Sequence, residues 1–186
     1  MKPLHILFVT FAFTLASTPG WAQHIAPGSP MPLLEITDKG ELVHDGDDFT
    51  FEPWSSSTQP ETVHVIQYFG ATLGDRDVFA PFTDLLQEEL EPGTVHVTTI
   101  LNLDAAMWGT KGMVMSELKK NKTAHPEATI VADADALGVD AWALGKQGTG
   151  LFILDHQGKL LFSTLGSLQQ DELAPTIELI RTNIAP

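Results

Sequence analysis

The chain has 186 residues, of which 43% are hydrophobic and 18% are charged, a composition typical of one globular domain with a packed core. Its net charge of −14 disfavours binding to nucleic-acid phosphates and to anionic lipid surfaces. Cysteine is absent, so no thiolate can attack a disulfide or a peroxide. Thiol oxidoreductase, disulfide isomerase and thiol-peroxidase activities are therefore excluded for this chain.

The first residues have the pattern of a cleavable export signal. Lys2 precedes an apolar run from Leu4 to Ala16, and the helix-breaking pair Pro19-Gly20 lies before the small residue Ala22. A membrane-spanning helix needs about 20 apolar residues, and this run is far shorter. The pattern predicts a signal peptide cleaved between Ala22 and Gln23 rather than a stable membrane anchor.

A small β element is predicted at the start of the mature chain. The turn-rich segment 26–32 leads into a short strand at 33–36, followed by a hairpin turn at 38–40. Further strand segments at 42–43 and 49–51 continue this element across a polar loop.

Two strand-and-helix units follow. Residues 63–69 are rich in β-branched and aromatic side chains, and the apolar periodicity of 77–90 predicts a helix with Pro81 in its first turn. A second buried strand at 95–101 precedes a polar helix at 113–122. Alternation of strand and helix is typical of a parallel sheet.

The last third of the chain predicts a strand at 128–132, a short helix at 137–144 and a turn at 148–150. Two apolar runs, 151–154 and 159–162, flank a polar tetrapeptide that ends in glycine, which indicates an antiparallel hairpin. An amphipathic closing helix uses Leu173, Ile177 and Ile180. This order is the thioredoxin topology: an α/β fold with a central mixed sheet flanked by helices and a small N-terminal β element.

The chain also resembles the YtfJ family of periplasmic thioredoxin-like proteins from about Leu33 to Ile180. The residues that carry the resemblance are Ile36-Thr-Asp-Lys-Gly-Glu-Leu42, Asp45, Phe49, Trp54, Asn102, Asp104, Gly112-Met113, Asn121 and Val139-Asp-Ala-Trp142. The resemblance implies a single domain over 23–186 and a location in the periplasm of a Gram-negative bacterium. It implies no particular activity.

Rough alignment with thioredoxins places the redox motif after Tyr68-Phe69, where this chain has Leu-Gly-Asp-Arg at 73–76. The cis-proline loop corresponds to 148–150, again without its signature residue. We therefore expect any binding surface beside Thr72 and Thr149 to work without thiol chemistry.

The loop 71–77 precedes a predicted helix, whose unpaired backbone N–H groups, together with Arg76, can receive an anion or a carboxylate. The alternative is that Asp75 or Asp77 caps the helix from within the chain. We favour capping, because two acidic residues already stand in place.

Four polar residues follow successive predicted parallel strands: Asn102 and Asp104 follow one strand, and Asp133 and Asp135 follow the next. Ligands of open α/β sheets tend to bind at this end of the strands, so these residues form a candidate site. The alternative, which we favour, is that they terminate strands and shape turns.

Metal and cofactor binding are not expected. His64 and His96 lie inside apolar strands, and no histidine pair has the helical spacing of zinc ligands, so both imidazoles are expected to be buried. Trp54, Trp108 and Trp142 can line a groove, although aromatic residues in a domain of this size more often belong to the core.

The function that these patterns favour is the binding of a protein or peptide partner in the periplasm by a thioredoxin-like domain without redox chemistry. The alternative is a non-thiol enzyme that uses the carboxylates of Asp104, Asp133 and Asp135. Neither function requires a cofactor, and neither involves nucleic acid.

Overall fold

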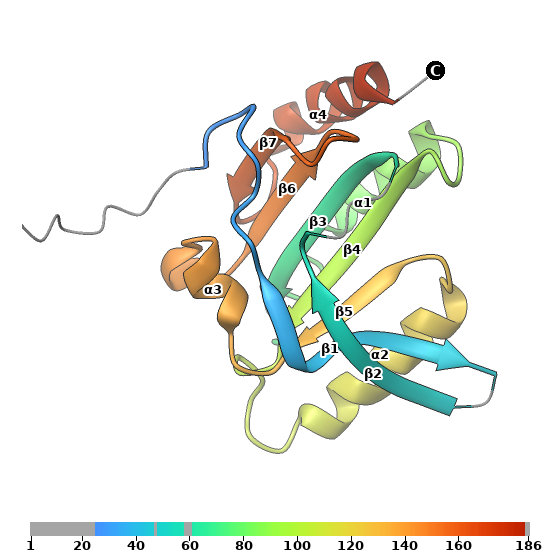
Figure 1. The fold of residues 1–186 in the computed structure, drawn as a ribbon, viewed down its shortest axis with the longest axis vertical. Helices are drawn as coiled ribbons and strands as arrows, with labels where there is room; N and C mark the ends of the chain where they lie inside the picture. The colour runs from blue at the N-terminus through green and yellow to red at the C-terminus, as the bar shows by residue number, and fades with distance from the viewer. Residues whose placement is uncertain (1–24, 47, 58–60, 185–186) are drawn as a thin grey trace, which may run out of the picture.

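The computed structural model describes residues 25–46, 48–57 and 61–184, so the predicted signal peptide and its cleavage site at Ala22 and Gln23 lie outside the described residues. One seven-stranded mixed sheet forms the centre of the described part, with the strand order β2-β1-β5-β4-β3-β6-β7 (Figure 1). The strands are β1 (Glu35–Asp45), β2 (Asp48–Ser55), β3 (Val63–Gly70), β4 (Val95–Asn102), β5 (Thr129–Asp133), β6 (Gly150–Leu154) and β7 (Leu160–Leu165). The helices are α1 (Ala80–Glu89), α2 (Lys111–Ala124), α3 (Leu137–Ala141) and α4 (Gln170–Asn183), with a 3-10 turn, η1 (Gly145–Gln147).

The predicted parallel core is confirmed. β3 and β4 run parallel from the pair Val63 and Val95 to the pair Gly70 and Asn102, and β4 and β5 are also parallel. The predicted hairpin is confirmed as well, because β6 pairs antiparallel with both β3 and β7. Together these pairings give the mixed thioredoxin-like sheet that the sequence predicted.

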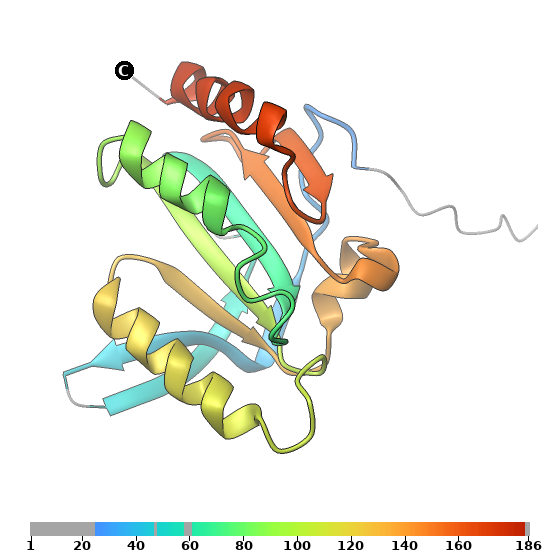
Figure 2. The same cartoon turned by 180° about the vertical axis from the view of Figure 1, so that it is seen from behind.

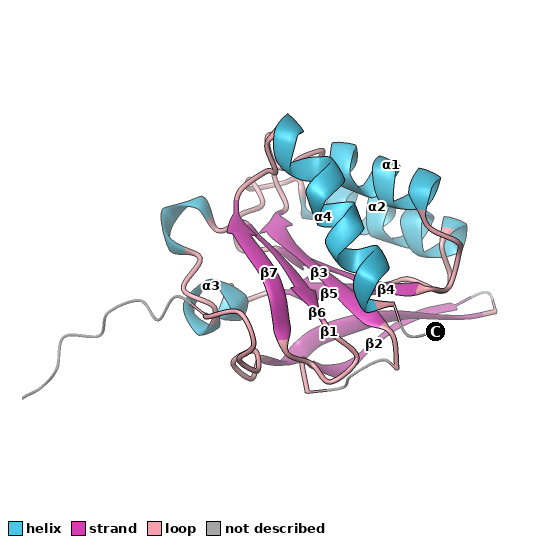
Figure 3. Cartoon of the chain, turned by 90° about the horizontal axis from the view of Figure 1, so that it is seen from above, coloured by secondary structure: helices cyan, strands magenta, loops and turns pink. Residues whose placement is uncertain are grey.

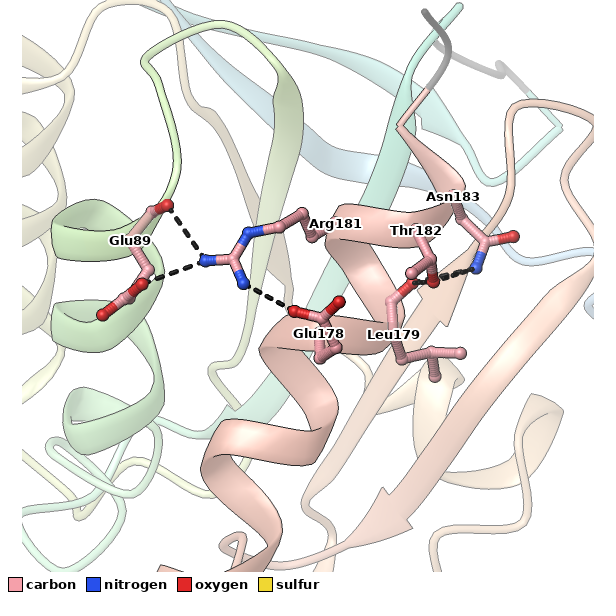
Figure 4. A network of polar contacts seen from close by, with 6 residues as sticks. All are labelled: Glu89, Glu178, Leu179, Arg181, Thr182 and Asn183. Atoms are coloured by element: carbon pink, nitrogen blue, oxygen red, sulfur yellow. Dashed lines mark hydrogen bonds and ion pairs between the residues drawn. The ribbon is translucent and has the colours of Figure 1, made fainter.

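Three helices cover one face of the sheet, and Figure 3 shows α1, α2 and α4 together on that side. α1 and α4 bury Phe82 and Ile177 in a cluster with Val65 of β3, and α2 packs Leu118 against Leu42 and other residues of the β1–β5 side. One exposed ion pair from Arg181 on α4 to Glu89 on α1 joins the two helices at their surface (Figure 4).

The opposite face is covered by α3 and by the segment that leads into β1. Trp142 packs edge-to-face against Tyr68 and Phe152, and its indole N–H donates to the carbonyl of Pro32 at 3.0 Å. Leu34 completes this second core. Burial on both faces explains why β3 and β6 are apolar along most of their length.

The hairpin turn predicted at 38–40 is wrong. β1 continues through these residues with an irregular register between Ile36 and Glu41, and the turn to β2 lies after Asp45. Gly40 has φ +82°, and a Cβ there would lie 2.1 Å from the carbonyl oxygen of Glu52. The glycine thus marks a β-bulge, which uses the same left-handed backbone as many turns.

The first helix begins later than predicted. Residues 77–79 form turns, and α1 starts at Ala80, with Pro81 in its first turn as expected. The helix predicted at 137–144 is regular only to Ala141 and is followed by the 3-10 turn η1.

Candidate functional site

The carboxyl ends of β3, β4 and β5 lie together at one edge of the sheet, which we call the carboxyl edge. Gly70 is paired with Asn102 and Asn102 with Asp133, so three successive strands end at the same level. The loop after β4 runs from this edge to the start of α2, while the loop after β3 turns back to α1 (Figure 2). The Ala71 amide, just after β3, donates to the carbonyl of Asn102 at 2.9 Å. The structure therefore places Asn102 and Asp133 side by side, as the sequence indicated.

Asp133 is fully buried and accepts hydrogen bonds at both of its carboxylate oxygens. The Leu137 amide donates to Oδ1 at 3.0 Å, while the Gly138 amide and the Tyr68 hydroxyl donate to Oδ2 at 2.9 and 2.8 Å. Burial, followed by the adjacent Asp133 charge, raises the pKa of Tyr68 well above its ordinary value, so the phenol remains a donor. This carboxylate anchors the start of α3.

Close packing strengthens the same anchor. A Cβ on Gly138 would lie 2.2 Å from the Tyr68 ring, so only glycine fits between α3 and β3. Ala136, immediately before α3, has φ +57°, a left-handed conformation that costs an alanine about 1 kcal/mol. The stabilisation from the Asp133 hydrogen bonds offsets this strain.

Asn102 is buried and shapes the loop that follows it. Its Oδ1 accepts hydrogen bonds from the amides of Asp104 and Ala105 at 2.9 and 3.3 Å, an Asx turn. The side chains of Asp104 and Asp135 are exposed to solvent. Of the four candidate polar residues, the two buried ones therefore organise the backbone and the two exposed ones face water.

The loop after β3 is held by a reciprocal pair. The Thr72 hydroxyl donates to Asp75 Oδ2 at 2.7 Å, and the Asp75 amide donates to Thr72 Oγ1 at 3.1 Å. The expected capping of α1 by Asp75 or Asp77 is wrong, because the N-cap is Phe79 and no side chain accepts a hydrogen bond there. The carbonyl of Asp77, and not its carboxylate, accepts a hydrogen bond from the Ala80 amide at 3.1 Å, and the carboxylate of Asp75 is hydrogen-bonded to Thr72.

Arg76 is exposed and engaged with nearby carboxylates. Its guanidinium lies 3.9 Å from Asp77 and 3.6 Å from Glu117 of α2, so it links the loop after β3 to the helix after β4. Thr149, in contrast, is only 3% exposed, and its carbonyl accepts a hydrogen bond from Gly166. Its side chain is not presented to solvent.

The sequence reasoning missed an apolar surface at the carboxyl edge. Among the described residues, large hydrophobic side chains are exposed after the ends of β3, β4 and β5 and at the last residue of β7, with Trp108 completely exposed and Leu73 83% exposed. We call the six residues Leu73, Met107, Trp108, Met113, Leu137 and Leu165 the carboxyl-edge apolar surface. The available signal was the placement of Met107-Trp108 in a polar, glycine-containing loop.

The other two tryptophans belong to the core. Trp54 is 8% exposed and Trp142 is 3% exposed, which confirms the core interpretation for these two and shows that it was wrong for Trp108.

His64 and His96 are paired neighbours near the first residues of β3 and β4, at the end of these strands away from the carboxyl edge. His64 is buried and its Nε2 lies 2.7 Å from Thr98 Oγ1, while His96, which is partly buried, contacts Thr129 at 3.0 Å. Burial, with a contribution from His96, lowers the pKa of His64 to about 3, so this imidazole is neutral at neutral pH. Within the described ranges, no group of three His, Asp or Glu side chains is arranged to hold a metal ion.

Two surface depressions lie on the described part of the chain, and the smaller is lined in part by Asp77. One of about 390 Å³ lies between Phe162 and α4, and one of about 330 Å³ lies between the start of α1 and the loop after β7. Neither is lined by Asn102, Asp104, Asp133 or Asp135. In the part of the chain that the structure describes, no helix has the length and apolar character needed to span a membrane.

Solved structures with the same fold include two with TM-scores of 0.58. One is a protein from Chlorobium tepidum with the provisional name thiol:disulfide interchange protein DsbE, 14% identical, covering 87% of this chain and 99% of that one. The other is the thioredoxin-like superfamily protein SPOA0173, also 14% identical, covering 85% and 100% of the two chains. At these identities the likeness establishes the fold alone.

Sequence relatives extend over most of the chain. The uncharacterized protein YtfJ of Escherichia coli K12 is 27% identical over 161 residues, which cover 86% of this chain and 88% of that protein. An uncharacterized protein of Haemophilus influenzae is 27% identical over 165 residues, 88% and 90% of the two chains. The model of the family described as "Bacterial protein of unknown function (YtfJ_HI0045)" matches residues 25–183, and the chain therefore belongs to that family.

Proposed function

We propose that this chain is an exported binding protein that holds a protein or peptide partner at the carboxyl-edge apolar surface. The observation that carries the proposal is the complete exposure of Trp108, with its exposed neighbour Met107, after β4, at the edge of the sheet where β3 and β5 also end in segments with exposed apolar residues. Exposed apolar residues that gather in one region, rather than scatter singly, are typical of interaction sites.

The base beneath this surface is rigid. Asp133 fixes the start of α3, the Thr72–Asp75 pair closes the loop after β3, and Asn102 closes the loop after β4. A surface whose backbone is already ordered loses little conformational entropy when a partner binds. Asn102, Asp133 and the Thr72–Asp75 pair therefore support the proposal as positioning residues, with the apolar side chains in direct contact.

The alternative, a non-thiol enzyme that uses Asp104, Asp133 and Asp135, fits the geometry less well. Both oxygens of Asp133 are already occupied by donors, and withdrawing them would release α3. Asp104 and Asp135 are exposed and line neither depression, so their carboxylates do not converge on a closed cavity there.

Export is part of the proposal and rests on the N-terminal pattern. Lys2, the apolar run and Ala22 predict cleavage before Gln23 and release into the periplasm. Mass spectrometry of periplasmic fractions should find a mature protein that starts near Gln23, whereas an intact Met1 in that fraction would contradict export.

Site-specific photo-crosslinking tests the binding function. p-Benzoylphenylalanine replaces Leu73 at the carboxyl edge in one variant and His156 in a matched control, since His156 is also exposed but lies in the turn at the opposite edge. We expect irradiation of living cells to give one discrete adduct from position 73, identified by mass spectrometry, and none from position 156. Identical adducts from both positions, or none from position 73, would overturn the proposal.

A further inference from the structure

The carboxyl-edge apolar surface is long enough to hold a structured segment of a partner. Its members follow β5, β4 and β3, and the last member, Leu165, ends β7. β7 reaches the same edge because Gly150 is paired with both Tyr68 and Leu165. Five neighbouring strands lie between and including β5 and β7, which corresponds to about 20 Å at the usual strand spacing. A helix of about 14 residues has this length.

Negative charge dominates the segments that carry this surface. Residues 71–79, 103–117, 134–148 and 166–172 contain the carboxylates Asp75, Asp77, Asp104, Glu117, Asp135, Asp140, Asp171 and Glu172 against the cations Arg76, Lys111 and Lys146. Of these cations, Arg76 is already paired with Asp77 and Glu117. The exposed apolar side chains therefore lie within an acidic rim.

Charge complementarity selects the occupant. A second copy of this chain would bring the same acidic rim and a net charge of −14 against it, and an anionic lipid surface would also be repelled. A segment with apolar residues on one side and Lys or Arg on the other satisfies both features. Met107 and Met113 add unbranched, adaptable side chains that can accommodate different apolar partners.

We propose that the carboxyl-edge apolar surface, framed by Asp104 and Asp135, docks a cationic amphipathic segment of a protein partner. The inference rests on the proposed binding function and names the chemistry of its partner. The apolar side of the segment covers Trp108 and Leu73, and its cations face the rim.

Fluorescence anisotropy with a defined probe tests this chemistry. The probe is a labelled 14-residue helical peptide built only of Leu and Lys on opposite faces, and the comparison peptide has Glu in place of every Lys. We expect the Lys peptide to bind at least about tenfold more tightly than the Glu peptide, with an affinity that falls as salt rises. Trp108→Ser should weaken Lys-peptide binding by about tenfold or more, because the central apolar contact is lost.

A matched pair of double variants separates local from overall charge. D104N together with D135N removes two carboxylates from the rim. E88Q together with E91Q removes two exposed carboxylates at the C-terminal end of α1 and just after it, away from the carboxyl edge. Only the first pair should weaken Lys-peptide binding, by about tenfold. Equal weakening by both pairs, or equal affinity for the Lys and Glu peptides, would overturn the inference.

The two proposals fail in different ways. A specific crosslink from position 73 combined with charge-independent peptide binding would leave the binding function standing and refute the cationic partner. Absence of the position-73 crosslink would refute the binding function itself.

Discussion

Two regions at the carboxyl edge of the sheet depart from the usual pattern of apolar residues inside and polar residues outside. Beneath the edge, Asp133 and Tyr68 are polar, buried and hydrogen-bonded to each other, while above it Trp108 and Met107 are apolar and exposed. The buried polar group has its donors and stabilises the fold, whereas no part of the described ranges covers the exposed apolar groups. Position at the carboxyl ends of parallel strands does not by itself distinguish these roles, but burial does.

The largest effect is expected from Asp133→Ala. The substitution leaves the Tyr68 hydroxyl and the amides of Leu137 and Gly138 without acceptors, so it should lower the free energy of unfolding by about 4 kcal/mol. Chemical denaturation measures the change. Asp135→Ala, an exposed control, should change it by at most about 0.5 kcal/mol, and equal effects of the two variants would contradict the anchoring role.

A pair of glycine substitutions tests the packing beside that anchor. Gly138→Ala should destabilise the protein by about 3 kcal/mol, because the new methyl group would meet the Tyr68 ring. Gly112→Ala in α2 has open space around the new Cβ and should instead stabilise by about 0.5 to 1 kcal/mol. Thermal or denaturant unfolding that ranked the two variants in the opposite order would refute the close packing of α3.

Acid sensitivity is expected at the other end of the same strands. Because the folded-state pKa of His64 is about 3 and its ordinary value is 6.5, the unfolded chain binds more protons between these two pH values. Stability from the neutral imidazole is therefore present above pH 6.5 and is lost as the pH falls.

Denaturation of the parent and of His64→Leu measures this effect. Between about pH 7 and about pH 5, the parent should lose about 2 kcal/mol more of its free energy of unfolding than the variant loses. Parallel pH profiles for the two proteins would show that His64 does not remain neutral in the fold.

The smallest effect is expected from Arg181→Ala at the helical surface (Figure 4). The guanidinium contacts Glu178 at 2.6 Å and Glu89 at 2.9 Å, but all three side chains are substantially exposed, so solvent screens the pairs. We expect a slight drop in the denaturation midpoint at low salt that disappears at high salt. A large drop independent of salt would contradict this assessment.

The strands and most helices were predictable because burial leaves a sequence signal: a run rich in β-branched and aromatic residues in Val63–Gly70, and the helical spacing of Leu173, Ile177 and Ile180. The bulge at Gly40 was mistaken for a turn, since both use a positive φ. The local sequence can indicate a glycine with a positive φ. Whether that glycine forms a turn or a bulge depends on how the adjacent strand, here β2, pairs with β1.

The candidate site was less predictable. The sequence placed Asn102 and Asp133 at the correct edge, but the donors to Asp133 are amides of α3 and a hydroxyl of β3, which only the folded chain brings together. Trp108 and Trp142 are the same residue type with opposite exposure, and the polar, glycine-containing loop around Trp108 was the local signal that separated them. Tertiary packing decides which tryptophan is buried.

The most direct test of the central claim is the yield of the position-73 photo-adduct in a chain that also carries Trp108→Ser. If the exposed apolar residues at the carboxyl edge are the binding surface, the adduct should be lost in that chain and persist in one that carries Arg181→Ala instead. An undiminished adduct in the Trp108→Ser chain would contradict the account.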